Sequence, residues 1–159
     1  MNMGYMGARI VTVFAVFRKL LDKDLDMGDY KNRLIVQKMT YMLKFILNRF
    51  DYSFSWYVRG PYSPTLTSEA FKFDDNSAVE NYEFDDNEKY AIERIRCLFN
   101  VRDENAWELF ASILYMLKEN NVTDKDKLVF MVHSLKPWFT EEQIIDAFNK
   151  IQTSGILGS

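Results

Sequence analysis

The apolar residues of this chain recur mainly at helical spacing, and the longest such run predicts a helix from Lys31 to Phe50. With 100° of rotation per residue, one face of this helix gathers its apolar side chains within roughly 140°; they are Ile35, Val36, Met39, Met42, Leu43, Ile46, Leu47 and Phe50. A second apolar strip on the far side holds Leu34, Tyr41 and Phe45. Apolar surface on two sides is typical of a central helix, so we expect neighbours on both flanks.

A strand is predicted directly after this helix. From Tyr52 to Arg59 apolar and polar residues alternate, which favours a strand with one buried face. Gly60-Pro61 is predicted to end it, and Ser63-Pro64 predicts the cap and first residue of a short helix that reaches Phe73. Because one strand is not stable alone, we expect a partner strand either near Asp74 to Phe84 or in a second chain.

The rest of the chain predicts helices joined by polar segments. One should run from Ala8 to Asp22, and four more should follow Asn87 and end by Thr153. The expected caps of these four are Asp85 or Asp86, Asp103, Thr123 or Asp124, and Thr140. Residues 74–86 combine low aliphatic content with high charge, and we predict an acidic loop there.

Composition places the chain in the ordinary globular class. A length of 159 residues, 48% hydrophobic content and 27% charged content predict one domain, residues 1–159, with a core that needs no disulfide. The single Cys and single His exclude an intramolecular disulfide and Cys- or His-rich metal sites. The apolar run from Ile10 to Phe17 is too short to span a bilayer, and its flanks do not suit a signal peptide. We therefore expect a cytoplasmic protein without metal or cofactor.

Charge is unevenly distributed although the net value is only −3. Residues 8–72 hold 11 basic and 6 acidic side chains, whereas residues 73–93 hold 1 basic and 8 acidic ones. The first segment favours an anionic partner and the second disfavours it. Neither has the basic content of a typical nucleic-acid-binding protein.

No catalytic constellation is visible. Phosphate-binding loops, dinucleotide fingerprints and nucleophile elbows are absent. Cys97 and His133 could form a nucleophile–base pair, but both lie in predicted helices with no oxyanion-binding element nearby. The repeated Phe-Asp-Asp-Asn segments lack the glycine and closing glutamate of a calcium loop, so helix capping explains their carboxylates better. An enzyme whose acidic residues assemble from distant positions stays open.

Two motifs carry a family resemblance. Leu34-x-x-Gln37-Lys38-x-x-Tyr41-x-Leu43 is followed by Phe54-Ser-Trp-Tyr-Val-Arg-Gly-Pro-Tyr-Ser-Pro64. Together they resemble the small prokaryotic YwgA-type family and, more distantly, the SocA-like (Panacea) antitoxin domain. Here Val36 and Met39-Thr40 replace the aliphatic residues usual around Gln-Lys. The resemblance implies a helical domain with a winged-helix-like core, which we place at residues 8–73. With the helical bundle expected over residues 87–153, the chain is predicted to be mostly α-helical with a small β element.

A polar stripe on the central helix is the candidate nucleic-acid surface. In a winged-helix protein such a helix can lie in the major groove, where Arg and Gln or Asn match the edges of guanine and adenine. The stripe consists of Arg33, Gln37, Thr40, Lys44 and Asn48. The apolar strips on both sides favour a polar seam that is either solvated or between helices, so DNA reading is the alternative hypothesis.

The Gly-Pro turn is the candidate protein-binding surface, because Tyr and Arg are enriched where interfaces carry most of their binding energy. Its residues are Tyr57, Arg59, Gly60, Pro61 and Tyr62. Similarity to antitoxin domains, which act by gripping a partner protein, implies the same role. We therefore predict a non-enzymatic, regulatory binding module that acts on an unknown protein partner or as a homodimer. A winged-helix DNA-binding regulator and an enzyme without a readable motif are the alternatives.

Overall fold

The computed structural model describes the backbone of residues 3–157 and the side chains of residues 9–157. This part of the chain is mostly helical and contains one two-stranded antiparallel sheet, which confirms the predicted fold class. In chain order the elements are α1 (Met3–Leu21), α2 (Tyr30–Leu47), β1 (Ser55–Tyr57), β2 (Gly60–Tyr62), α3 (Pro64–Lys72), α4 (Asn76–Glu80), α5 (Asp86–Leu98), α6 (Glu104–Lys118), α7 (Lys125–Leu135) and α8 (Glu141–Ser154).

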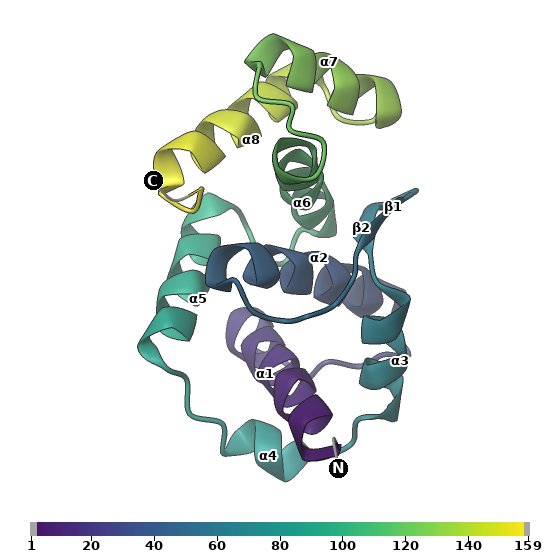
Figure 1. Ribbon diagram of the computed structural model, residues 1–159, viewed down its shortest axis with the longest axis vertical. Helices are drawn as coiled ribbons and strands as arrows, with labels where there is room; N and C mark the ends of the chain where they lie inside the picture. Colours follow the sequence, from purple (N-terminus) through teal and green to yellow (C-terminus); the bar gives the residue numbers. More distant parts are fainter. Residues whose placement is uncertain (1–2, 158–159) are drawn as a thin grey trace.

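Helix α2 runs through the middle of the molecule, with α1, α3 and α4 toward one end and α6 to α8 toward the other (Figure 1). It contacts α1, α3, α5, α6 and β2. Every side chain from Leu34 to Leu43 is buried, so neighbours cover the helix on all sides over three turns. The prediction of a central helix with partners on both flanks is confirmed.

The central helix is shorter than the sequence pattern suggested. Asp29 caps its start by accepting a hydrogen bond from the Asn32 N–H, and the helix ends at Leu47 rather than Phe50. Asn48 adopts the left-handed conformation, with φ 54°, and Phe50 also has a positive φ of 68°. Asn tolerates this conformation better than most residues, so a local backbone preference ends the helix while apolar periodicity continues.

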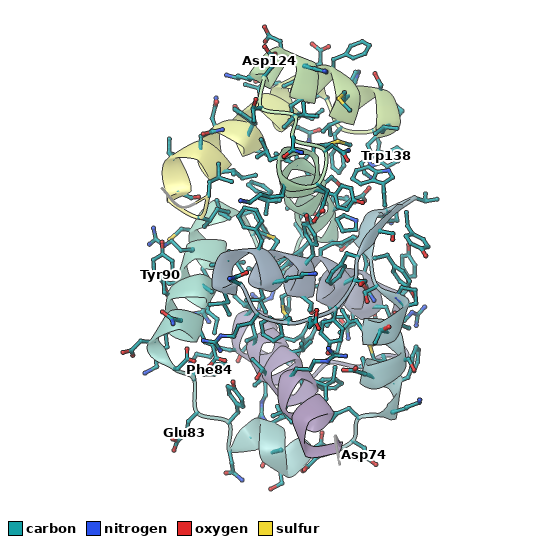
Figure 2. The ribbon with its side chains drawn as sticks, in the orientation of Figure 1. Asp74, Glu83, Phe84, Tyr90, Asp124 and Trp138 are labelled. Atoms are coloured by element: carbon teal, nitrogen blue, oxygen red, sulfur yellow. The ribbon has the colours of Figure 1, made fainter. Side chains whose placement is uncertain are left out.

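Helices α5 to α8 form the predicted C-terminal group, in which α8 contacts α5, α6 and α7. Their caps agree with the sequence expectation: Asp85, Asp103, Asp124 and Thr140. Helical spacing also predicts Tyr90 on the inner face of α5, but this prediction is wrong, because Tyr90 is 50% exposed on the surface of the molecule (Figure 2). Ile92, on the opposite side of α5, is buried instead.

The sheet differs from the predicted single strand. Gly60-Pro61 does not end a strand but belongs to β2, which pairs with β1 through Trp56 opposite Pro61 and Tyr57 opposite Gly60. The strand partner is thus neither the segment near Asp74 to Phe84 nor a second chain. Proline is tolerated in β2 because its missing N–H would point away from β1.

The acidic segment of residues 74–86 also has more structure than predicted. It contains the short helix α4, capped by Asp75. Val79 is buried, and the Tyr82 hydroxyl donates to Glu88 Oε2 at 2.7 Å while accepting from the Thr12 hydroxyl at 2.8 Å. Core contacts of this kind accompany the order of a segment whose composition indicated a loop.

Gly60→Ala is expected to destabilise the protein by about 2 kcal/mol, because Gly60 has a φ of 102° that side-chain-bearing residues rarely adopt. An added Cβ would also lie 3.0 Å from Ser112 Oγ. Urea unfolding followed by circular dichroism measures the change. Gly28→Ala is the matched control, with an expected change within about 0.5 kcal/mol because its added Cβ meets only the exposed Asp26 side chain. Equal effects of the two substitutions would contradict this account.

Candidate functional site

Gln37 and Lys38 on α2 hold the hairpin of β1 and β2 in place. The Gln37 side chain accepts from the Ser63 N–H at 2.8 Å and donates to the Ser63 carbonyl at 3.1 Å. The Lys38 ammonium donates to the Pro61 carbonyl at 2.8 Å. Both side chains are 2% exposed. The two motifs that carry the family resemblance thus contact each other, and their contact fixes the hairpin against α2.

Four charged side chains meet beneath the hairpin, and we call them the hairpin charge cluster: Lys38, Arg59, Glu108 and Lys136. Glu108 is fully buried on α6 and accepts from Arg59 Nε at 2.5 Å and from Lys136 Nζ at 2.9 Å. Lys136 Nζ also donates to the Val58 carbonyl at 2.8 Å. The cluster therefore connects α2, α6 and the end of α7 to the hairpin.

Burial changes the acid–base behaviour of both lysines. Desolvation lowers the pKa of Lys38 from 10.5 to about 7, with Glu108 acting in the opposite direction and Lys136 and Arg59 adding to the lowering. Desolvation also lowers the pKa of Lys136, although Glu108 opposes this shift. Three cations face one carboxylate, so the cluster carries a charge of +2 when Lys38 is protonated and +1 when it is neutral.

Exposed aromatic and apolar side chains surround the hairpin tip. We call them the hairpin patch: Val58 (82% exposed), Tyr30 (58%), Trp138 (52%) and Tyr57 (47%). Trp138, in the connection between α7 and α8, lies beside the hairpin tip (Figure 2). Its ring centroid is 5.4 Å from Lys136 Nζ. Because large exposed side chains on a rigid support are typical of contact surfaces, the patch is the candidate functional site.

The predicted protein-binding residues lie together, but they are not equally accessible. Tyr57 is exposed and packs at a tilt against the half-buried Tyr62, with 4.9 Å between ring centroids. Gly60 and Pro61 are buried. Arg59 directs Nε inward to Glu108 and leaves its side chain 31% exposed. The turn itself is thus mainly structural, and its tip is the accessible part.

Three residues of the hairpin patch were not among the sequence candidates: Tyr30, Val58 and Trp138. Trp138 follows Pro137 between two predicted helices, and an aromatic residue in a connection is a signal that could have been used. Val58 was assigned to the buried face of the strand by alternation, whereas the turn places it at the tip. Only the tertiary structure brings Tyr30 to this site, where its hydroxyl accepts from Arg59 Nη1 at 3.3 Å.

The structure does not bring the candidate nucleic-acid residues together on one exposed surface. Gln37 and Thr40 are buried, at 2% and 0% exposure. Arg33 donates to the Met27 carbonyl at 2.9 Å and Lys44 to the Tyr52 carbonyl at 2.5 Å. Both side chains thus hydrogen-bond to the backbone of the loops that flank the helix. Asn48 is exposed at the end of the helix. Of the two kinds of polar seam that the flanking apolar strips allow, solvated or between elements, Gln37 and Thr40 belong to the buried kind.

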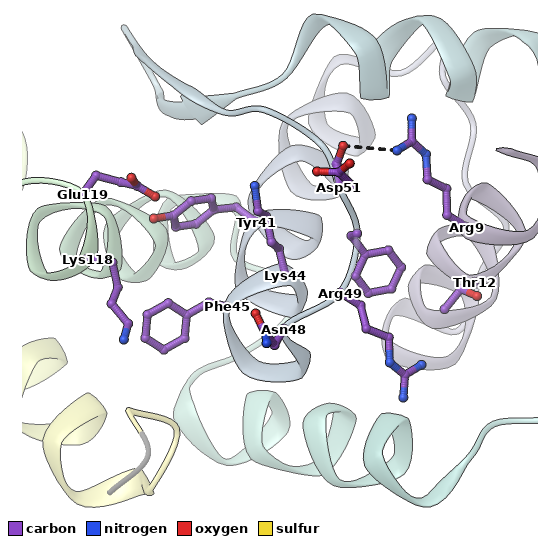
Figure 3. Close-up of a pocket in the computed structure, with 11 residues that line it drawn as sticks. Arg9, Thr12, Tyr41, Lys44, Phe45, Asn48, Arg49, Asp51, Lys118 and Glu119 are labelled. Carbon is purple, nitrogen blue, oxygen red and sulfur yellow. Dashed lines mark hydrogen bonds between the residues drawn. The ribbon is translucent and has the colours of Figure 1, made fainter. Parts of the chain in front are cut away.

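Lys44 and Asn48 line an open cavity of about 710 Å³ between the ends of α2 and α6, the loop after α2, and α1 (Figure 3). Arg9, Arg49 and Lys118 add positive charge, and Asp51 and Glu119 add negative charge. Arg9 and Arg49 also pair with carboxylates outside the cavity, and two helix C-termini with partial negative charge end beside it. These charges nearly balance, so the cavity has no strong preference for an anion.

Other chemistry is not assembled in the described part of the chain. Cys97 is exposed on α5, whereas His133 Nδ1 on α7 lies 2.7 Å from the Phe139 carbonyl oxygen. The two side chains are therefore not arranged as a nucleophile–base pair. Among residues 9–157 no three His, Cys, Asp or Glu side chains gather as metal ligands. No described helix is both long enough and apolar enough to cross a bilayer.

No family model, curated protein or solved structure matches this chain. Its site is therefore interpreted from its own geometry and chemistry.

Proposed function

We propose that this protein is a non-enzymatic binding module that grips a partner protein with the hairpin patch. The observation that carries this proposal is the exposure of Val58, Tyr57 and Trp138 over a tip that buried groups hold in place. Because the Lys136 and Lys38 ammonium groups bind hairpin carbonyls, the tip is preorganised, and binding need not order a flexible loop. The resemblance to an antitoxin domain that grips its partner agrees with this role.

The experiment compares three forms of the tagged chain in lysate of its native host, each followed by size-exclusion chromatography with mass determination after nuclease treatment. We expect wild type to elute with a co-purifying protein. Val58→Asp combined with Trp138→Ser should reduce recovery of that protein about tenfold or more, because a charge and a lost aromatic anchor disrupt the centre of the contact. Phe71→Ser is the matched control, because Phe71 is 58% exposed near the end of α3 and is not part of the hairpin patch, and it should retain the complex.

Two outcomes would overturn the proposal. One is a complex that survives in the Val58 and Trp138 variant, with thermal melting showing that the variant is folded. The other is a bare monomer for all three forms. A complex that disappears with nuclease and absorbs at 260 nm would instead support the DNA-binding alternative. In that case Arg33→Glu with Lys44→Glu should abolish binding, and the affinity should fall steeply with salt.

A further inference from the structure

The outer edge of β1 is open. The backbone of β1 pairs with β2 and lies near no other helix or strand in the described part of the chain, although the Trp56 ring packs against Tyr115 of α6. The Pro61 carbonyl accepts a hydrogen bond from the Lys38 ammonium and therefore points away from β1. Trp56 and Pro61 are thus a non-hydrogen-bonded pair of the antiparallel ladder. The N–H and C=O of Trp56 therefore point to the open side. No described residue hydrogen-bonds to either group.

Open edges of this kind accept an extended segment of another chain. Figure 1 shows the hairpin at the rim of the molecule, with β1 on the side away from α2. A segment that pairs with Trp56 forms two backbone hydrogen bonds, each of which contributes only about a fivefold gain in affinity. Side-chain contacts must supply the rest of the affinity and the specificity.

Charge at the hairpin tip indicates which side chain the segment carries. Arg59 meets Glu108 through Nε, but Nη1 and Nη2 reach only the neutral Tyr30 hydroxyl and Asn105 Oδ1, each at 3.3 Å. These two nitrogens belong to the exposed end of a cluster with a net charge of +1 to +2. The nearby Glu104 is already paired with Lys31 at 3.2 Å. A carboxylate from outside would replace weak neutral acceptors with charge-assisted hydrogen bonds.

We infer that the partner of this protein presents an extended acidic segment, which adds a third strand at the Trp56 edge and places an Asp or Glu side chain against Arg59. This inference rests on the proposed protein-binding function. The exposed Val58 and Trp138 side chains cover apolar residues of the same segment on either side of its acidic residue. The kind of partner is thus a protein with an accessible acidic strand or tail.

The test begins with selection of short random peptides displayed on phage against the immobilised full-length chain. We expect the enriched peptides to share one acidic position between β-branched or aromatic residues. The best of them is then synthesised in four forms: unmodified, with the acid replaced by its amide, and N-methylated at alternate residues in each of the two registers. Calorimetry measures the affinity of each form for the full-length chain.

Strand addition predicts that N-methylation weakens binding about tenfold or more in one register and leaves it nearly unchanged in the other, because only alternate N–H groups face β1. The amide form should also bind the wild-type protein about tenfold more weakly than the acid form. The acid and amide forms of the peptide should bind the Arg59→Gln variant with equal affinity. Thermal melting checks that this variant is folded. Arg102→Gln is the control for loss of an exposed arginine, and it should keep the preference for the acid.

Each other outcome overturns the inference. If neither register of N-methylation matters, the segment does not add a strand. If acid and amide bind wild type equally, or if no peptide is enriched, the partner is not an acidic extended segment. These failures differ from failure of the proposed function, because the complex from host lysate depends on Val58 and Trp138 whatever the conformation of the partner.

Discussion

Replacing Glu108 by Gln is expected to lower the free energy of unfolding by about 3–5 kcal/mol. Glu108 is fully buried and accepts from both Arg59 and Lys136, and it is the only carboxylate of the hairpin charge cluster. The amide keeps the shape of the side chain but leaves buried cations without a counter-charge. Urea unfolding monitored by circular dichroism and by tryptophan fluorescence measures the loss.

Two further variants separate charge from packing in this experiment. Glu104→Gln breaks the partly exposed ion pair with Lys31, and loss of a pair of this kind should cost less than about 1 kcal/mol. Adding Lys136→Met to Glu108→Gln should recover part of the stability, since the buried ammonium leaves together with its carboxylate. A loss for Glu108→Gln no larger than for Glu104→Gln would show that the cluster is not a buried network.

Stability is expected to rise with pH between about 7 and 9.5 because of Lys38. The pKa of Lys38 is 10.5 in the unfolded chain and about 7 in the folded protein, so the unfolded chain holds this proton more tightly between the two values. The free energy of unfolding therefore increases with pH in this window, by up to about 1.4 kcal/mol per unit for one such group. The stabilisation is complete only above the unfolded pKa, and it is lost as the pH falls toward 7.

Lys38→Met removes this dependence. Between pH 7.5 and pH 9.5, the free energy of unfolding of wild type should increase by about 2 kcal/mol relative to that of Lys38→Met. Lys136, whose pKa is also lowered by burial, leaves a residual slope in the variant. Measurements stop at pH 9.5 because burial raises the pKa values of Tyr41 and Tyr52, which makes alkaline conditions above pH 10 destabilising.

Chemical denaturation at five pH values tests the prediction. Lys23→Met on the exposed loop after α1 controls for the removal of one positive charge and should keep the slope of wild type. Parallel curves for wild type and Lys38→Met across the window would show that Lys38 keeps its proton in the folded protein. The net charge of the hairpin charge cluster would then be the larger of its two values, which bears directly on the acidic partner inferred above.

Local patterns were enough for the longer helices of this protein, although they missed the short α4. Apolar periodicity predicts α2 as a central helix, and the side chains of Asp85, Asp103, Asp124 and Thr140 mark the starts of α5 to α8. Such signals succeed because helix formation and capping depend on residues within a turn of one another. The error at Phe50 arises because the left-handed conformation of Asn48 ends the helix while apolar periodicity continues, and the error at Tyr90 concerns one position on a helix face.

The hairpin could not be predicted in the same way. Alternation from Tyr52 to Arg59 indicated one longer strand. The observed hairpin is instead held by Lys38 of α2, whose ammonium group binds the Pro61 carbonyl. A period-2 pattern does not show where a strand folds back. In this chain, contacts between residues 23 to 26 positions apart set the turn.

The sequence by itself determined the helical class, the positions of the caps, the absence of recognised catalytic motifs and the importance of the segment from Gln37 to Pro64. Only the tertiary structure decided which charges are buried and which aromatic residues are exposed. Lys38, Glu108 and Lys136 look like ordinary surface residues in sequence, because burial of a charge depends on partners from other elements. Val58 and Trp138 lie 80 positions apart in the chain, and they become one surface because Lys136 binds the Val58 carbonyl beneath the ring of Trp138.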